Sequence, residues 1–360
     1  MSRVIIMGDL HIGAKQGSIS VADLQIKFLK EVIAEAVKLG IDTIVQVGDI
    51  FDHQTHTKHV VFDHWKREFF QPMKAAGIKM ITLVGNHDTP FKNTILVNSS
   101  RLFLGGYDNI QVIDEPGDVS ILGYNCLILP WICADNYARS IECIQTSTSE
   151  IAFGHLDLTG FEMYKGNVNT GGMDPAVFKR FGKVFSGHFH TVSSKGNVMY
   201  VGSPFELTWA DCDDPRGVFI YDFKTKQVEP IQNTNKVFYR IEYDDSVDFD
   251  DDQDFIDSLL DDKELADKYV RLVVVNKKNP TIFDSVVDAI NNKNPFDFKI
   301  VELTSDYSAD SVELSDDITD VADTMQTISG YVDGVDDDNL DKDKLKVYFK
   351  SLYISALEKE

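Results

Sequence analysis

Five short apolar runs in this sequence each end at a glycine, and each glycine is followed at once by a residue type that binds metal ions. Asp, Asn and His in combination suit divalent ions such as manganese, iron or zinc better than calcium. One such step would mean little, but five in order predict a metal centre. The steps are Gly8-Asp9-Leu10-His11, Gly48-Asp49, Gly85-Asn86-His87-Asp88, Gly154-His155 and Gly187-His188-Phe189-His190.

The candidate ligands are too many for one ion and predict two, with Asp49 as the natural bridge. Two Asp charges against two divalent ions leave a formal charge of about +2, which attracts a phosphate, holds its oxygens and activates a bound water. An acidic protein can in this way offer a locally positive centre. The seven candidate ligands are Asp9, His11, Asp49, Asn86, His155, His188 and His190.

The third step contains a histidine that the metals do not need. Because Asn86 takes a ligand role, His87 can face the leaving group, and an imidazole can supply the proton that an alkoxide needs near neutral pH. Its neighbour Asp88 either orients that imidazole or caps the turn. We therefore expect His87, with Asp88, to be catalytic.

The elements that carry these residues read as strands. Apolar runs of four to six residues rich in Val and Ile are typical of strands buried on both faces. Glycine at the strand end permits a tight turn, and the next side chain projects from the carboxyl end, where open α/β sheets place their sites. Amphipathic helices are predicted at residues 22–39 and 60–70, so strands and helices alternate as in an α/β core.

The chain divides into three predicted parts. Residues 1–235 hold all five steps and form the α/β core. Residues 236–304 contain no histidine and predict a small β-α-β-α-β domain. Residues 305–360 predict an acidic linker and two amphipathic helices, which either pack back on the body or dock a partner helix or coiled coil.

Composition limits the class of protein. A length of 360 residues predicts about two domains, and a hydrophobic content of 43% is ample for a core. The four cysteines show no CxxC spacing and are expected to be reduced thiols. No signal peptide is recognised, and no apolar stretch approaches the roughly 20 residues of a membrane span. We expect a soluble, cytoplasmic protein, in a host cell if it is viral.

The net charge of −23 argues against strong binding to DNA by this chain alone, because Lys and Arg supply most non-specific affinity for DNA. The imbalance is uneven. Residues 305–345 hold twelve Asp, one Glu and two Lys, which gives −13 + 2 = −11. Nearly half of the excess charge therefore lies in one stretch.

The motifs D-x-H, GDxxD, GNHD, GH and GHxH, in this order, resemble those of the calcineurin-like metallophosphoesterase superfamily. Their combination is similar to the nuclease subunits of the SbcCD type, which process double-strand breaks with a coiled-coil ATPase, and to the corresponding subunits of T-even-type phages. The motifs cover the first 190 residues, whereas the likeness of the later parts rests on layout. The resemblance implies a two-sheet α/β sandwich flanked by helices, a small capping domain and a C-terminal helical segment for partner binding.

The resemblance also implies a set of roles. Manganese is the implied working metal, with His87 as proton donor. The implied activity is phosphodiester cleavage in DNA recombination, repair and replication, as a duplex-end exonuclease and a single-strand or hairpin endonuclease. One ion would be held by Asp9, His11, Asp49 and His190, the other by Asp49, Asn86, His155 and His188.

The implied assembly is a homodimer within a heterotetramer that contains an SMC-like coiled-coil ATPase. The dimer would form through apolar helices near residues 60–70 and 95–104. From the sequence alone, those faces could equally belong to the core.

The second motif departs from part of the family. Archaeal and eukaryotic members have a histidine where this chain has Asp52, whereas the bacterial and phage branch has Asp. The resemblance therefore does not imply a second catalytic histidine at this position. The nearby residues His53, His56, Lys58 and His59 form either a substrate-facing loop, a plain solvated loop or a further metal site.

Two rival functions remain open. A phosphomonoesterase of the same superfamily would carry GDxxDRG and GNHE, but here His53-Gln54 follows Asp52 and the third motif ends in Asp88. The missing Arg, which grips a phosphate in those enzymes, favours a diester substrate. A non-catalytic scaffold on the same fold would be expected to have lost ligands, whereas this chain keeps all seven and His87.

Overall fold

The apolar runs form strands of two six-stranded sheets in a computed structural model. The structure describes residues 2–302 except 165, 248 and 250, together with 342, 344 and 345. The chain separates into two compact units: Met1–Leu207, Asp211–Tyr239 and Asp267–Tyr269 form the first, and Thr208–Ala210, Arg240–Ala266 and the residues from Val270 onward form the second. Both sheets lie in the first unit.

The first sheet carries the three N-terminal ligand steps. Its strand order is β14-β13-β1-β2-β3-β4, and β1 to β4 run parallel to one another. Strands β13 and β14 are antiparallel additions at one edge. The strands are β1 (Arg3–Met7), β2 (Thr43–Gln46), β3 (Lys79–Leu83), β4 (Ile110–Ile113), β13 (Arg216–Asp222) and β14 (Val228–Asn233).

The second sheet carries the two remaining steps. Its order is β11-β12-β10-β7-β6-β5, in which β6, β7, β10 and β12 are parallel. The strands are β5 (Gly117–Ile121), β6 (Tyr124–Leu129), β7 (Ile151–His155), β10 (Lys183–Gly187), β11 (Ser193–Lys195) and β12 (Val198–Tyr200). A separate hairpin joins β8 (Glu162–Tyr164) to β9 (Asn167–Val168).

The two sheets pack face to face. Successive side chains of a strand point to opposite faces, so each strand contributes to two buried clusters. Val4 and Ile6 of β1 share a buried cluster with Phe153 and Phe185 of the second sheet. The alternate residue Ile5 belongs to a different cluster, built with the helices on the outer face of the first sheet. Each strand is therefore buried on both faces, as its apolar run predicts.

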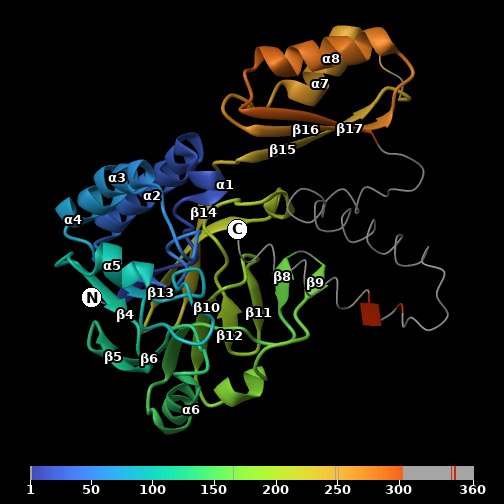
Figure 1. Ribbon diagram of the computed structural model, residues 1–360. Helices are drawn as coiled ribbons and strands as arrows, with labels where there is room; N and C mark the ends of the chain where they lie inside the picture. Colours follow the sequence, from blue (N-terminus) through green and yellow to red (C-terminus); the bar gives the residue numbers. More distant parts are fainter. Residues whose placement is uncertain are drawn as a thin grey trace. The chain divides into compact units, whose positions relative to one another are not determined.

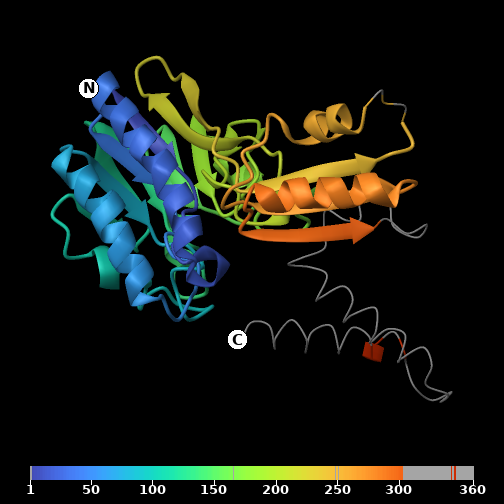
Figure 2. The ribbon, with the colours of Figure 1, turned by 90° about the horizontal axis from the view of Figure 1, so that it is seen from above.

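Helices cover the outer faces of both sheets (Figures 1 and 2). The longest is α2, Ile19–Leu39, which Ser18 caps through its hydroxyl and which ends at Gly40 in the left-handed conformation. The others in this unit are α1 (Ala14–Gly17), α3 (His59–Trp65), a π-helical turn (Lys66–Phe70), α4 (Gln71–Ala75), α5 (Ser99–Leu104), α6 (Tyr137–Thr146) and two 3₁₀ turns (Pro175–Phe178, Trp209–Asp211).

The later part of the chain forms a three-stranded sheet of order β15-β16-β17 with two helices. Asp251 caps the first helix, and Asn279 caps the second, just before Pro280. Tyr243 packs edge-on against both helices, through Phe255 and Phe283. The elements are β15 (Phe238–Asp244), α7 (Asp252–Leu260), β16 (Tyr269–Asn276), α8 (Pro280–Asn292) and β17 (Asp297–Glu302).

These observations confirm the predicted α/β fold class with two sheets flanked by helices, and the β-α-β-α-β order after residue 236. The predicted helix pair at 305–360 lies outside the described residues, apart from 342, 344 and 345. Among the described residues, no helix combines the length and apolar character needed to cross a membrane.

Candidate metal centre

The five glycine steps bring their ligands to one place because they follow the carboxyl ends of parallel strands in both sheets. The glycines are needed where the sheets approach each other. A Cβ on Gly187 would lie 2.5 Å from Asp9 Oδ1, and a Cβ on Gly48 would lie 2.2 Å from His155 Nδ1. In both cases a glycine of one sheet meets a candidate ligand of the other.

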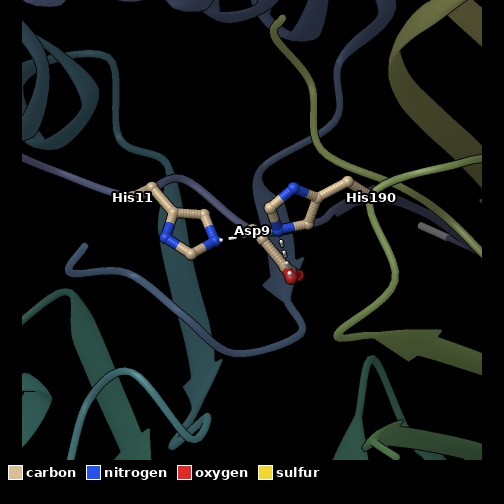
Figure 3. A group of neighbouring side chains, drawn as sticks. All are labelled: Asp9, His11 and His190. Carbon is tan, nitrogen blue, oxygen red and sulfur yellow. Dashed lines mark hydrogen bonds and ion pairs between the residues drawn. The ribbon is translucent and has the colours of Figure 1, made fainter. Parts of the chain in front are cut away.

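The first cluster consists of Asp9, His11 and His190, whose ligand atoms all lie within 4.8 Å of one another (Figure 3). The Nε2 atoms of His11 and His190 are 3.0 Å apart, and His190 Nε2 is 3.8 Å from Asp9 Oδ2. Two imidazole nitrogens that bind one ion at right angles, each about 2.1 Å away, would be about 3.0 Å apart. The donor set and its spacing therefore fit a divalent ion.

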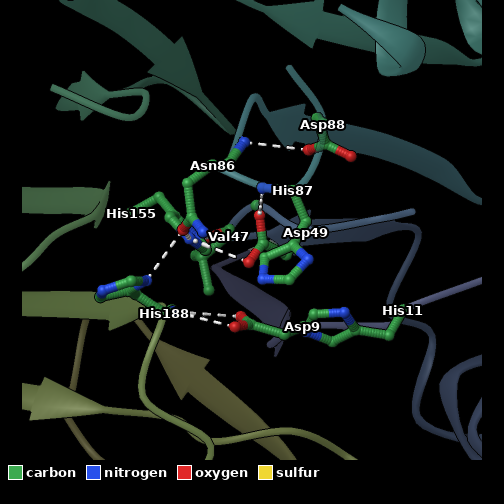
Figure 4. Close-up of polar contacts among 12 residues, drawn as sticks. Asp9, His11, Val47, Asp49, Asn86, His87, Asp88, His155 and His188 are labelled. Carbon is green, nitrogen blue, oxygen red and sulfur yellow. Dashed lines mark hydrogen bonds and ion pairs between the residues drawn. The ribbon is translucent and has the colours of Figure 1, made fainter. Parts of the chain in front are cut away.

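The second cluster consists of Asp49, His155 and His188, and Asn86 joins it (Figure 4). Asn86 Oδ1 lies 2.9 Å from both His155 Nε2 and His188 Nδ1. His155 Nε2 is 3.3 Å from Asp49 Oδ2. The structure thus assembles all seven sequence-predicted ligands in two adjoining groups, and a mixed nitrogen and oxygen set of this kind suits manganese, iron or zinc.

Contacts behind the ligands fix their orientation. His155 Nδ1 lies 2.8 Å from the Val47 carbonyl, so it carries the proton and leaves Nε2 to face the cluster. His11 Nδ1 lies 3.2 Å from Asp52 Oδ1, so its Nε2 also points inward. A carbonyl behind His155 and a carboxylate behind His11 are the kinds of contact that hold metal-binding imidazoles in place.

Backbone amides also hold the two carboxylates in position. The His188 amide donates to Asp9 Oδ2 over 3.0 Å, and the His87 amide donates to Asp49 Oδ1 over 2.8 Å. His11, Asp49 and His188 have positive φ angles of 47°, 53° and 89°. Left-handed backbone at a residue other than glycine costs about 1–3 kcal/mol and collects at functional sites.

Burial and charge act in opposite directions on the first cluster. Burial raises the pKa of Asp9 to about 7, while the charge of His155 acts in the opposite direction and lowers it. Burial alone would lower the pKa of His11, but contact with Asp52 and the charge of Asp49 raise it to about 9. A metal ion that binds here must therefore displace a proton from His11.

The two histidines that follow β10 behave differently. Burial, and then the charge of His155, lower the pKa of His188 to about 3. Burial, and then the charge of His11, lower the pKa of His190 to about 3. Both imidazoles are therefore neutral near neutral pH and present a nitrogen lone pair to an ion.

His87 lies beside both clusters without joining either. Its ring lies near that of His11 (Figure 4), with the centroids 4.8 Å apart. Its Nδ1 lies 2.7 Å from the Asp52 carbonyl. Of the two roles considered for Asp88, orienting this imidazole or capping the turn, the contacts favour the second. Asp88 Oδ1 accepts the Phe51 amide over 3.1 Å and Oδ2 accepts the Gly85 amide over 2.9 Å, which is the turn-capping role.

The loop after the second step stays at the surface. His53, His56 and Lys58 are all exposed, and the rings of His53 and His56 lie 3.9 Å apart. The two candidate metal groups found among the described residues include none of the three. Their predicted contact with a substrate stays a prediction.

Sequence reasoning missed two residues that support the centre. Asp52 contacts His11 through its carboxylate and His87 through its carbonyl, and the second Asp of GDxxD is the signal that marks it. Arg216 is buried, donates to the His190 carbonyl, and is held by Asp211 and Asp214 at 2.8 Å each. Only the tertiary structure brings Arg216 next to His190.

Comparison with known proteins finds relatives in sequence and one weak structural likeness. Exonuclease subunit 1 of Enterobacteria phage T4 is 33% identical over 359 residues, which cover 99% of this chain and 100% of that protein. The DNA double-strand break repair protein Mre11 of Sulfurisphaera tokodaii is 26% identical over 132 residues, 34% of this chain and 32% of that protein. A solved structure described as a novel archaeal phosphodiesterase has a TM-score of 0.34 and 11% identity, covering 64% of this chain and 99% of that one.

The family model described as calcineurin-like phosphoesterase matches residues 2–192, the part of the chain that carries all seven candidate ligands and His87. With a nearly full-length relative at 33% identity beside it, this match shows that the chain belongs to the calcineurin-like phosphoesterase family.

Proposed function

We propose that this chain is a manganese-dependent nuclease that hydrolyses phosphodiester bonds in DNA, as an exonuclease on duplex ends and an endonuclease on single strands and hairpins. The observation that carries the proposal is the pair of adjoining clusters, Asp9 with His11 and His190, and Asp49 with His155 and His188, beside a histidine that belongs to neither. The names of the two relatives, an exonuclease subunit and a break-repair protein, support DNA as the substrate.

Each cluster would hold one ion, and Asp49 would be shared. The first ion would take Asp9, His11, Asp49 and His190, and the second would take Asp49, Asn86, His155 and His188. When bound, two divalent ions polarise a phosphate and lower the pKa of a bound water to near neutrality. The protein fixes its ligands beforehand through the His87 and His188 amides and the Val47 carbonyl.

His87 would give a proton to the leaving oxygen. Its Nδ1 is committed to the Asp52 carbonyl, so Nε2 is the nitrogen that can exchange a proton with a substrate. The side chain is only partly exposed. The hydrogen bond to a backbone carbonyl, rather than to Asp88, orients the ring.

A phosphomonoesterase is the alternative within the family. The residues after Asp52 are His53 and Gln54, so the chain lacks the Arg with which such enzymes grip a terminal phosphate. A scaffold without activity is the other alternative, and the complete ligand set argues against it.

We also propose a homodimer that works with a coiled-coil ATPase subunit. Val60 of α3 and Leu102 of α5 are 62% and 73% exposed, and Leu96, just before α5, is 83% exposed. The two helices contact each other through Phe62 and Phe103, with ring centroids 4.8 Å apart. The exposed apolar side chains therefore lie on neighbouring elements. Residues 305–360, most of which lie outside the described residues, would dock the ATPase.

Digestion of end-labelled duplex and hairpin DNA tests the function. We expect cleavage with manganese that EDTA stops, and an Asp49→Asn variant that is inactive on both substrates. A parallel assay with p-nitrophenyl phosphate examines the monoester alternative. Hydrolysis of the monoester without cleavage of either DNA would favour a phosphatase, and no hydrolysis of any substrate, with or without the ATPase, would favour a scaffold.

A further inference from the structure

A pocket of about 290 Å³ opens next to the second cluster. Its walls include Trp131, Ile132, Tyr137, Leu156, Asp157 and Met173. The Trp131 ring centroid is 5.0 Å from that of His188 and 6.0 Å from that of His155, and Leu156 directly follows His155. The pocket therefore adjoins the place where the scissile phosphate would be held.

The walls of this pocket are held in position. The Trp131 amide donates to the Val84 carbonyl over 2.8 Å, and the Trp131 carbonyl accepts from Asn136 Nδ2 over 2.9 Å. Asn136 Oδ1 also accepts the Cys133 amide over 2.9 Å, so residues 131–136 form a closed turn. A backbone held in this way needs little ordering when the Trp131 side chain binds a flat partner.

The chemistry of the walls selects the kind of partner. The lining residues include two aromatic rings and several apolar side chains, with one carboxylate and no Lys or Arg. Asp157 would repel a phosphate, whereas an uncharged planar group can stack on Trp131. A volume near 300 Å³ lies at the small end of ligand pockets, which suits a single ring system.

We propose that this pocket takes a nucleobase of the DNA nucleotide next to the scissile phosphate, stacked on Trp131. The inference rests on the proposed nuclease function and deepens it. A base reaches the pocket only after it leaves its own stack, so the pocket favours single strands, hairpin loops and frayed ends over the interior of a duplex. Trp131 is then a residue that determines substrate choice.

A purely structural role for Trp131 makes a different prediction. The ring also packs against the small core of Val84, Ile95 and Cys133. If it served only to support that core and His188, its loss would slow cleavage of every substrate by the same factor. A nucleobase site would instead make the effect of Trp131 depend on whether the base is present.

The test compares a single-stranded oligonucleotide with versions that carry a tetrahydrofuran abasic residue on either side of the mapped cleavage site. For the wild type, we expect kcat/KM to fall about 5- to 150-fold when the stacked base is removed. For Trp131→Ala, we expect the same fall on normal DNA and no further fall on the abasic DNA. Trp131→Phe should keep most of the base dependence, and Phe296→Ala, an exposed aromatic outside the pocket, should keep all of it.

A second measurement does not depend on cleavage. With 2-aminopurine at the same position and manganese present, the slow variant His87→Gln should quench the fluorescence of the base, and the double variant that also carries Trp131→Ala should not. Equal losses on normal and abasic DNA, or quenching that survives Trp131→Ala, would overturn the pocket. A wild type that cleaves no DNA with manganese would refute the nuclease function instead, so the two failures are distinguishable.

Discussion

Asp52 connects the two kinds of chemistry at this centre. Its carboxylate contacts the candidate ligand His11, and its backbone carbonyl contacts the candidate proton donor His87. The position at which the chain departs from part of its family is thus occupied by a residue with two defined contacts. Under the proposed mechanism, the side chain would support metal binding through His11, and the backbone carbonyl would orient His87 as the acid.

The role of His87 can be separated from metal binding because neither cluster includes it. We expect His87→Gln to lower kcat by about 10²–10⁴-fold, the usual contribution of a general acid. Manganese binding, measured by calorimetry, should stay at two ions. His64→Gln is the control, since His64 of α3 pairs with Asp23 of α2 at 2.7 Å and belongs to neither cluster. A His87→Gln variant with wild-type turnover on hairpin DNA would end the proton-donor proposal.

Asp52→Asn should change how metal binding depends on pH. Asp52 helps to raise the pKa of His11 to about 9, so at lower pH an ion must displace the His11 proton. Affinity of the wild type should therefore rise with pH up to about 9. In the variant, the pKa of His11 falls, so the rise in affinity should end at a lower pH, while affinity above the transition should be about 10–100-fold weaker because His11 loses its orienting partner.

Manganese titrations at several pH values, with Asp63→Asn as an exposed control on α3, would measure this effect. Parallel pH profiles for the wild type and Asp52→Asn would show that Asp52 does not tune His11.

The convergence of the seven candidate ligands could be predicted from the sequence because each lies at or just after the end of a strand, and the carboxyl ends of parallel strands meet at one edge of a sheet. The contacts of Asp88 could not be predicted, because one of its two amide partners, Phe51, is distant in the chain and is brought to Asp88 only by the fold. The contact of Arg216 with the His190 carbonyl joins residues that are distant in the chain. A local sequence pattern cannot predict a contact of that kind.

At the scale of elements, strand ends and turns were easier to predict than interruptions. The helix predicted at 60–70 exists, but it passes from α3 into the π-helical turn Lys66–Phe70. The strands are recognisable by their apolar runs, whereas the order of strands within each sheet follows from packing of the whole unit. Register and order depend on distant partners, so a sequence window cannot contain them.

Gly85, just before Asn86, lies so close to Asp49 that the loops after β2 and β3 leave no room for a side chain there. A Cβ at Gly85 would lie 2.1 Å from Asp49 Oδ1 and 2.4 Å from the Asp49 amide. We expect Gly85→Ala to displace Asp49 and to lower activity about 100-fold or more, the cost of a shift of about 1 Å at a reacting centre. Calorimetry should also show a lost or weakened manganese site.

The matched control is Gly106→Ala, because a Cβ there has no neighbour within 4 Å. Circular dichroism should show intact secondary structure in both variants. Two full-strength manganese sites in Gly85→Ala would show that the turn tolerates a side chain.

At the scale of the whole molecule, the charge opposes the proposed substrate. The chain carries −23, so DNA is repelled everywhere except near bound cations and local basic groups. We expect the chain alone to bind duplex DNA with a Kd no tighter than about 10⁻⁶ M at physiological salt. Fluorescence anisotropy over a salt series would measure this, with the ATPase complex as the comparison. Tight binding by the isolated chain that is indifferent to salt would contradict the expectation.

The two clusters draw their ligands from both halves of the sandwich. Asp9 and Asp49 follow strands of the first sheet, whereas His155, His188 and His190 belong to the second. An ion in either cluster is therefore also a cross-link between the sheets. Since a ligand that binds only the folded state stabilises it by mass action, ions held in these clusters would stabilise the fold in addition to the role proposed for them in catalysis. Chelation would then weaken the resistance of this protein to heat and proteases along with its chemistry.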